Sequence, residues 1–407
     1  MASPDWGAVF RLSCVLDEEV DPLILDGAVA RALRRFRPFA VSLRRGLFWY
    51  YHEEIDAAPP VLPEAGPLCA MPDASDNEGH LFRVLHRGSR VSLELFHSLA
   101  DGSGALSFLK TIVACYYEAR GLPIVEGEGV LDPDGAPDPE ESEDAFARYA
   151  GDPRGRSFAE ERAWSPPGPG LPPPGLRLVA GRIEAAALAA KAKERGATIT
   201  ALLSGCFLKA LDASQREDEG LPQLPVRLQI PVNMRKACPS RTLRNFSLYA
   251  NVALPLSERP PSLDEAVRAA AEGMRAGHDP DELAKMMALN VSAERHPALR
   301  AAPLALKRLA LRTAYALVGD ASFTAALSNL GAVALPEPLS ARVREFGFAL
   351  GRGRKPGVNL AVVGYSGKVL ATTTSDLIDR NVEREFFRTL SGLGLDVEIE
   401  SNDGGAA

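Results

Sequence analysis

His97-Ser98-Leu99-Ala100-Asp101-Gly102 stands where an alternating apolar stretch of the chain gives way to helical spacing. The preceding residues Leu81 to Phe96 alternate around Arg87-Gly88-Ser89, which predicts two antiparallel strands joined by a tight turn. After the stretch, Asp101 or Ser103 can cap a helix. Its predicted apolar face consists of Leu106, Phe108, Leu109, Ile112, Val113 and Tyr116. The sequence therefore predicts one imidazole at the end of a strand, followed by a short turn and a helix.

An imidazole in that place suits general-base chemistry, because its pKa lies near neutral pH and the strand supports it rigidly. Asp101, four residues further on, can serve as a nearby charge for His97, as a helix cap, or as the partner of a buried arginine. The H-x-x-x-D spacing is unspecific on its own. The alternative interpretation of His97 is a core histidine that is hydrogen-bonded at a strand end.

Three segments, in order along the chain, resemble motifs of the CoA-dependent acyltransferase superfamily. This superfamily has the chloramphenicol acetyltransferase-like fold and an H-H-x-x-x-D-G signature, and the resemblance is strongest to bacterial alcohol acetyltransferases and condensation-domain proteins. The segments are Phe96 to Gly102, then Pro231-Val232-Asn233-Met234-Arg235 with Leu243-Arg244-Asn245-Phe246, and Ser328-Asn329-Leu330-Gly331. Phe96 replaces the first histidine of the signature, whereas the second, His97, corresponds to the catalytic one.

The resemblance implies an α/β fold of two lobes, each a mixed sheet with flanking helices, with a tunnel between them. It also implies that Asp101 points away from the reaction and forms a supporting salt bridge, for which Arg235 is the candidate partner. Because a tetrahedral intermediate needs a hydrogen-bond donor for its oxyanion, Ser328 or Asn329 is predicted to supply one. Gly102 and Gly331 are interpreted as positions where the absence of a side chain lets the backbone turn beside the substrate. The alternative for Ser328 to Gly331 is a simple polar turn.

Composition excludes several classes of function. The net charge of −7 argues against a nucleic-acid-binding protein, which needs a basic surface. Five dispersed cysteines and irregularly placed histidines indicate neither a disulfide framework nor a metal site, and His80 and His86 are interpreted as surface residues. Phosphate-loop, nucleophile-elbow and metalloprotease motifs are absent from the sequence. With no visible secretory signal and no apolar span, we expect a cytoplasmic protein without a transmembrane segment.

Patterning along the chain predicts two lobes. We expect an N-terminal lobe over residues 1–163 that begins β-α-β, a linker over 164–177, and a C-terminal lobe over 178–407. The β-α-β unit is predicted from strands at 8–16 and 39–51 around a helix at 22–36. Leu299 to Val318 is interpreted as an amphipathic helix that packs on the protein, with a lipid contact as the alternative. The basic run Gly351-Arg352-Gly353-Arg354-Lys355 is interpreted as a solvated loop, with contact to coenzyme A phosphates as the alternative.

These observations predict an acyltransferase of the alcohol acetyltransferase kind. It would move an acyl group from acyl-CoA, a co-substrate rather than a bound cofactor, to a small-molecule alcohol or amine, with His97 as the general base. A free-standing condensation-type enzyme that takes its thioester from a carrier protein is the nearest alternative. A catalytically silent binding module on the same fold is the alternative from another class.

Overall fold

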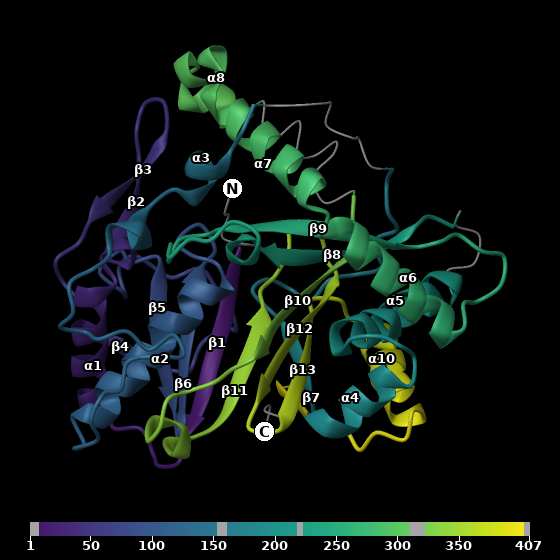
Figure 1. Cartoon of the computed structure of the whole chain (residues 1–407), viewed down its shortest axis with the longest axis horizontal. Coiled ribbons are helices and arrows are strands. Elements are labelled where there is room, and N and C mark those ends of the chain that lie inside the picture. Colours follow the sequence, from purple (N-terminus) through teal and green to yellow (C-terminus); the bar gives the residue numbers. More distant parts are fainter. Residues whose placement is uncertain (1–7, 153–160, 218–222, 309–321, 403–407) are drawn as a thin grey trace.

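The computed structural model describes residues 8–152, 161–217, 223–308 and 322–402, and places two sheet-centred bodies side by side (Figure 1). The first body contains a five-stranded sheet in the order β11-β1-β6-β5-β4. The second contains a seven-stranded sheet in the order β14-β7-β13-β12-β10-β8-β9. The α/β class and the two sheet-rich bodies predicted from the sequence are confirmed, whereas the tunnel stays a prediction.

The first body is built mainly from the N-terminal half of the chain. Its strands β1 (Val9–Leu16), β5 (Phe82–Arg87) and β6 (Arg90–Phe96) are antiparallel neighbours, and the short β4 (Val61–Pro63) runs parallel to β5. Helices α1 (Pro22–Arg35) and α2 (Gly102–Glu118) pack on this sheet. Phe36, Phe39, Phe82 and Phe108 meet between them in edge-on and tilted ring contacts. This core fixes the strand end that carries His97.

One strand of the first sheet comes from the other end of the chain. Strand β11 (Val343–Leu350) is antiparallel to β1, with Cys14 opposite Phe346 and Phe10 opposite Leu350. The next strand, β12 (Val358–Tyr365), lies in the seven-stranded sheet. By sequence β11 belongs to the 178–407 segment, and by pairing it belongs to the first body. The chain therefore crosses from the first sheet to the second between β11 and β12, and a strand of the C-terminal segment completes the first sheet.

The second body completes the described structure. Its remaining strands are β7 (Arg177–Glu184), β8 (Val226–Asn233), β9 (Ser247–Leu254), β10 (Ala325–Ala332), β13 (Lys368–Ser375) and β14 (Glu398–Ser401). Its helices are α4 (Ala185–Lys193), α5 (Ile199–Glu217), α6 (Leu263–Gly277) and α10 (Asn381–Gly392). Figure 1 shows these helices on the side of the sheet that faces away from the first body. The other face of the sheet is left to meet the first body, where β10 and its motif lie.

The predicted strand at 39–51 is wrong in detail. A 3-10 turn (Arg37–Phe39) leads into β2 (Val41–Arg45), which pairs only with β3 (Tyr50–Glu54) in a separate two-stranded ribbon. The predicted order of strand, helix and strand is present as β1, α1 and β2, but β2 is shorter than predicted and does not join the sheet of β1. The chain reverses at residues 46–49, where the Gly46 N–H donates to the Trp49 carbonyl at 2.9 Å. Large apolar residues occupy this turn, so the usual turn signals are missing.

Several further elements connect the strands and helices of the two bodies. They comprise 3-10 turns at Pro139–Ser142, Met234–Lys236 and Leu339–Arg342, and the helices α3 (Ala145–Tyr149), α7 (Pro280–Arg295) and α8 (Pro297–Ala301). The predicted amphipathic helix over Leu299 to Val318 lies only partly within the described structure, because residues 309–318 fall outside it. Among the described helices, none has both the length and the apolar character that crossing a membrane requires.

His80 is buried, contrary to its interpretation as a surface residue. Its side chain lies against Phe82, and its Nε2 is 2.8 Å from the Ala57 carbonyl oxygen. Burial lowers the pKa of the His80 imidazole. The residue sits at the start of a strand whose partner segment folds over it, a contact that local patterning does not reveal.

Candidate active site

His97 lies at the end of β6, on the edge of the sheet where β1 begins and β11 ends. Its backbone N–H donates to the Ala8 carbonyl at 2.6 Å, and the chain turns at once through a Leu99 N–H bond to the Phe96 carbonyl at 2.9 Å. The imidazole packs edge-on against Phe10, with ring centroids 5.1 Å apart. In the part of the chain that the structure describes, neither ring nitrogen has a hydrogen-bond partner. Packing against Phe10 orients the ring, and both nitrogens are without a protein hydrogen-bond partner in the described residues.

Asp101 fulfils two of the roles predicted for it at once. Its Oδ1 accepts hydrogen bonds from the N–H groups of Ser103 and Gly104, each at 3.1 Å, and so caps α2. Its Oδ2 accepts from the Phe246 N–H at 2.9 Å and from Nη1 of Arg235 at 2.6 Å. Asp101 is buried, and among the described residues its carboxylate makes no hydrogen bond with the His97 ring. It therefore does not orient the imidazole directly, and acts on the loop and helix around it.

The ion pair predicted between Asp101 and Arg235 is present, and Arg235 extends it into the second body. The guanidinium donates to the Thr242 carbonyl from Nε at 3.0 Å and from Nη2 at 2.8 Å, and from Nη2 to the Arg244 carbonyl at 2.7 Å. Asn233 adds a bond from its Nδ2 to Oγ of Ser103 at 3.0 Å. Residues 233–246 are thereby fastened to the first turn of α2, directly after the histidine loop.

Two glycines let neighbouring segments approach the start of α2. A Cβ at Gly102 would lie 2.6 Å from Cδ2 of Leu330, which shows that the Ser328 to Gly331 motif packs against the histidine loop. A Cβ at Gly104 would lie 2.0 Å from the Leu243 carbonyl oxygen. The structure thus brings together all three segments that resemble the family, although more than 200 residues separate the first from the last.

The two glycines differ in the kind of atom that a side chain would meet, and this difference is testable. We expect Gly104→Ala to lower the free energy of unfolding by about 1–3 kcal/mol, because the Leu243 backbone cannot move without disturbing the Asp101–Arg235 loop. Gly102→Ala should cost less, because the Leu330 side chain can rotate away. Urea denaturation of both variants checks this, and equal stabilities would contradict it.

The Asn329 side chain makes its hydrogen bonds within the second body. Its Nδ2 donates to Oγ1 of Thr200, at the start of α5, at 2.8 Å, and its Oδ1 accepts from the Gly331 N–H at 2.8 Å. Gly331 has a φ of +75°, at the point where the register between β10 and β12 shifts. The interpretation of Gly331 as a position where the backbone turns fits this conformation. The alternative of a polar turn describes the Asn329 side chain well.

Ser328 faces the opposite way. It pairs in parallel register with Ala361 of β12, and neighbouring residues on parallel strands point to the same face of a sheet. Ala361 belongs to the core of the first body, whereas Leu360 and Val362, on either side of it, belong to the core of the second. The Ser328 hydroxyl therefore projects toward the body that carries His97. In the described residues no hydrogen-bond partner engages that hydroxyl.

The basic loop between β11 and β12, residues 351–355, is only partly exposed to solvent, because Arg352 contacts other parts of the protein. Arg352 holds Asp376 at 3.0 Å and donates to the carbonyls of Gly175 and Leu171. Burial raises the pKa of the Asp376 carboxyl. A small cavity lies here, lined by residues that include Arg354 and Lys355, both exposed. Contact with coenzyme A phosphates stays a hypothesis for these two side chains.

Some features of the site gave no sequence signal. Phe10 orients the His97 ring, yet in the sequence it is one of many apolar residues in a strand. The groups that accept hydrogen bonds from Arg235 are backbone carbonyls, and every residue type has one, so the sequence does not reveal them. Within the described ranges, no three metal-ligating side chains gather into a cluster.

Comparison with known proteins identifies the architecture. No family model matches the chain, and no curated protein matches it. Among solved structures, TRI101 of F. sporotrichioides, complexed with coenzyme A and T-2, superposes with a TM-score of 0.62 at 11% identity over 97% of each chain. Polyketide synthase associated protein 5 from Mycobacterium tuberculosis gives 0.59 at 13% identity, over 94% of this chain and 92% of that one.

A third solved structure comes from the peptide synthetases. The first condensation domain of the CDA synthetase gives a TM-score of 0.55 at 15% identity, over 95% of this chain and 90% of that one. Similarity at this level of identity concerns the fold. The chain has the fold that CoA-dependent acyltransferases and condensation domains share, in agreement with the three motifs that meet at the start of α2.

Proposed function

We propose that this protein is an acyltransferase that moves an acyl group from an acyl-CoA thioester to an alcohol or amine, with His97 as the general base. The observation that carries the proposal is the His97 ring itself. It lies at a strand end beside the contact of the two bodies, packing against Phe10 orients it, and no protein group occupies its nitrogens in the described residues. A structural histidine in a core would be hydrogen-bonded, as His80 is.

The reaction needs one proton carrier. A ring nitrogen of neutral His97 accepts the proton of the acceptor hydroxyl while its oxygen attacks the thioester carbonyl carbon. The carbonyl π electrons move to the oxygen, which becomes the oxyanion of a tetrahedral intermediate. When the carbonyl re-forms, the carbon–sulfur bond breaks and the thiolate takes the proton from the imidazolium. The products are an ester and free thiol, and His97 is neutral again without a covalent enzyme intermediate.

Ser328 is the residue we assign to the oxyanion, in preference to Asn329. Its hydroxyl faces the body that carries His97 and is unengaged, whereas the Asn329 amide is bonded to Thr200. We expect Ser328→Ala to lower kcat by about 10²–10³ with little change in stability. Asn329→Ala should instead cost about 1–2 kcal/mol of stability through its lost hydrogen bonds. Steady-state kinetics with urea denaturation separates the two, and the reverse pattern would assign the oxyanion to Asn329.

The identity of the acyl donor, acyl-CoA or an acylated carrier protein, distinguishes the main proposal from its nearest alternative. Condensation domains share the fold, and a free-standing one would take its acyl group from a carrier protein. A steady-state assay with acyl-CoA, a panel of alcohols and amines, and no carrier protein decides between them. Turnover supports an acyl-CoA donor. Turnover only with an acylated carrier protein would establish the condensation-type alternative.

A silent binding module is the alternative from another class. It would retain the fold and hold a hydrophobic ligand without reaction. Incubation of a cell extract with labelled acetyl-CoA, with wild-type protein and with His97→Ala in parallel, tests this. The acyltransferase predicts at least one labelled product that depends on His97. If no donor gives such a product, the protein is a binder.

A further inference from the structure

The tip of the β2–β3 ribbon exposes a run of large apolar side chains. Leu47 is 72% exposed, and Phe48, Trp49, Tyr50 and Tyr51 are between 43% and 51% exposed. The ribbon belongs to neither large sheet, and every residue of β3 is exposed. Soluble proteins rarely expose contiguous apolar side chains in this way, and where they do, the surface usually binds something.

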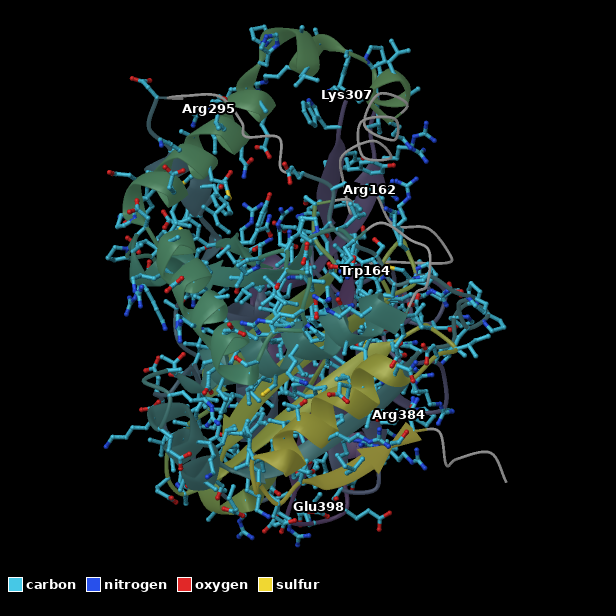
Figure 2. All side chains as sticks on the ribbon, turned by 90° about the vertical axis from the view of Figure 1, so that its right-hand side faces the viewer. Arg162, Trp164, Arg295, Lys307, Arg384 and Glu398 are labelled. Carbon is cyan, nitrogen blue, oxygen red and sulfur yellow. The ribbon has the colours of Figure 1, made fainter. Side chains whose placement is uncertain are left out.

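A second segment joins this tip to form one surface. The Leu304 N–H donates to the Leu47 carbonyl at 2.8 Å, and Nζ of Lys307 donates to the Phe48 carbonyl at 2.9 Å. The Lys307 ammonium also lies 3.3 Å from the centre of the Trp49 ring. Figure 2 shows Lys307 at the end of the molecule opposite Arg384 and Glu398. We call Leu47 to Tyr51 together with the exposed Leu299 and Leu306 the aromatic rim.

The charge around the aromatic rim differs from that of the protein as a whole. The chain carries a net charge of −7, yet residues 43–52 and 295–308 contain six lysines and arginines and no acidic residue. The acidic residues of the ribbon, Glu53 and Glu54, lie opposite Ser42 and Val41 at its base, where the Glu53 carboxylate pairs with Arg44 at 2.6 Å and leaves the other five cations unneutralised by the ribbon. Within the described structure, Arg45 and Arg300 have no carboxylate partner. The rim is therefore a cationic and aromatic surface on an anionic protein.

We propose that the aromatic rim docks this protein on the surface of an anionic phospholipid membrane. Tryptophan and tyrosine favour the boundary between lipid headgroups and acyl chains, where one edge of the ring is apolar and the other is wet. Leucine and phenylalanine at the tip enter the acyl region, and Arg45 and Arg300 face the lipid phosphates. Lys307 is held by Trp49 and the turn, so it fixes the shape of the rim.

Vesicle co-sedimentation of the full chain tests this proposal without reference to catalysis. We expect wild-type protein to bind vesicles of phosphatidylcholine mixed with phosphatidylglycerol, and to bind pure phosphatidylcholine far less. Leu47→Ser/Phe48→Ser should lower the partition coefficient at least about tenfold, since two apolar side chains no longer leave water. Leu23→Ser, which changes a leucine that is 84% exposed on α1, is the matched control and should bind as wild type does.

The charges are tested separately. Arg45→Gln/Arg300→Gln should weaken binding to anionic vesicles by about fivefold for each guanidinium, and not change the little binding to neutral vesicles. Wild-type protein that fails to sediment with anionic vesicles would overturn the proposal. Equal binding by wild type and Leu47→Ser/Phe48→Ser would overturn it as well. A dimer that the Leu47→Ser/Phe48→Ser variant loses, in the absence of vesicle binding, would instead assign the rim to a second copy of the chain.

Discussion

Replacing His97 with alanine is expected to lower kcat/KM for acyl transfer by about 10²–10⁴ and to leave the fold intact. The rate falls because no other group lies in its place to take the proton of the acceptor. Stability changes little, since the half-buried ring contacts Phe10 but makes no side-chain hydrogen bond in the described residues. Release of free thiol from acyl-CoA, followed against time, measures the rate, and circular dichroism with thermal unfolding measures the fold.

His296 provides the matched control for this experiment. It is exposed, its side chain caps neither of the helices it joins, and it lies outside the segments that meet around His97. His296→Ala should therefore react at the wild-type rate. A His97→Ala variant that folds normally and keeps more than about a tenth of the wild-type rate would remove His97 from the role of general base.

Replacing Asp101 with alanine is expected to destabilise the protein by about 3–5 kcal/mol and to impair catalysis as a consequence. The change leaves the partly buried Arg235 guanidinium without its counter-charge and removes the cap of α2. It also frees the Phe246 N–H, which lies at the start of β9. Urea denaturation followed by fluorescence measures the free energy of unfolding, and Asp101→Asn gives a folded variant should Asp101→Ala fail to accumulate.

A helix cap without an ion pair serves to separate the loss of the α2 cap from the loss of the Asp101–Arg235 ion pair. Asp279 caps α7 through the N–H groups of Asp281 and Glu282, and it is exposed. Asp279→Ala should cost only about 1 kcal/mol. The difference between the two variants reports the buried ion pair, and a double-mutant cycle with Arg235→Ala isolates it. If Asp101→Ala costs no more than Asp279→Ala, the ion pair does not hold the histidine loop.

Much of this site could be predicted because its determinants are local. The hairpin before His97 has alternating side chains and a glycine in its turn, and the helix after it has a cap and an apolar face. The partnership of Asp101 and Arg235 came from the resemblance to a family, and the structure shows the contact. Sequence periodicity alone would not have joined two residues 134 positions apart.

The parts that could not be predicted depend on contacts between distant segments. Strand β11 joins the first sheet because its register fits β1, and such pairing leaves no mark in either strand alone. The turn at Gly46 to Trp49 carries large apolar residues where turns usually carry small polar ones, so the sequence pattern predicts a continuous strand there. To choose between Ser328 and Asn329 as the oxyanion donor, one must know which side chain of β10 points toward the first body. The pairing of β10 with β12 defines this.

The most direct test of the central claim is a crystal structure of the protein with a non-hydrolysable acyl-pantetheine, the arm that coenzyme A and carrier proteins have in common. We predict that its carbonyl carbon lies beside the His97 ring, with the carbonyl oxygen about 2.7–3.1 Å from the Ser328 hydroxyl. An acyl-pantetheine bound away from His97, with that ring closed off by protein on every side, would contradict the account.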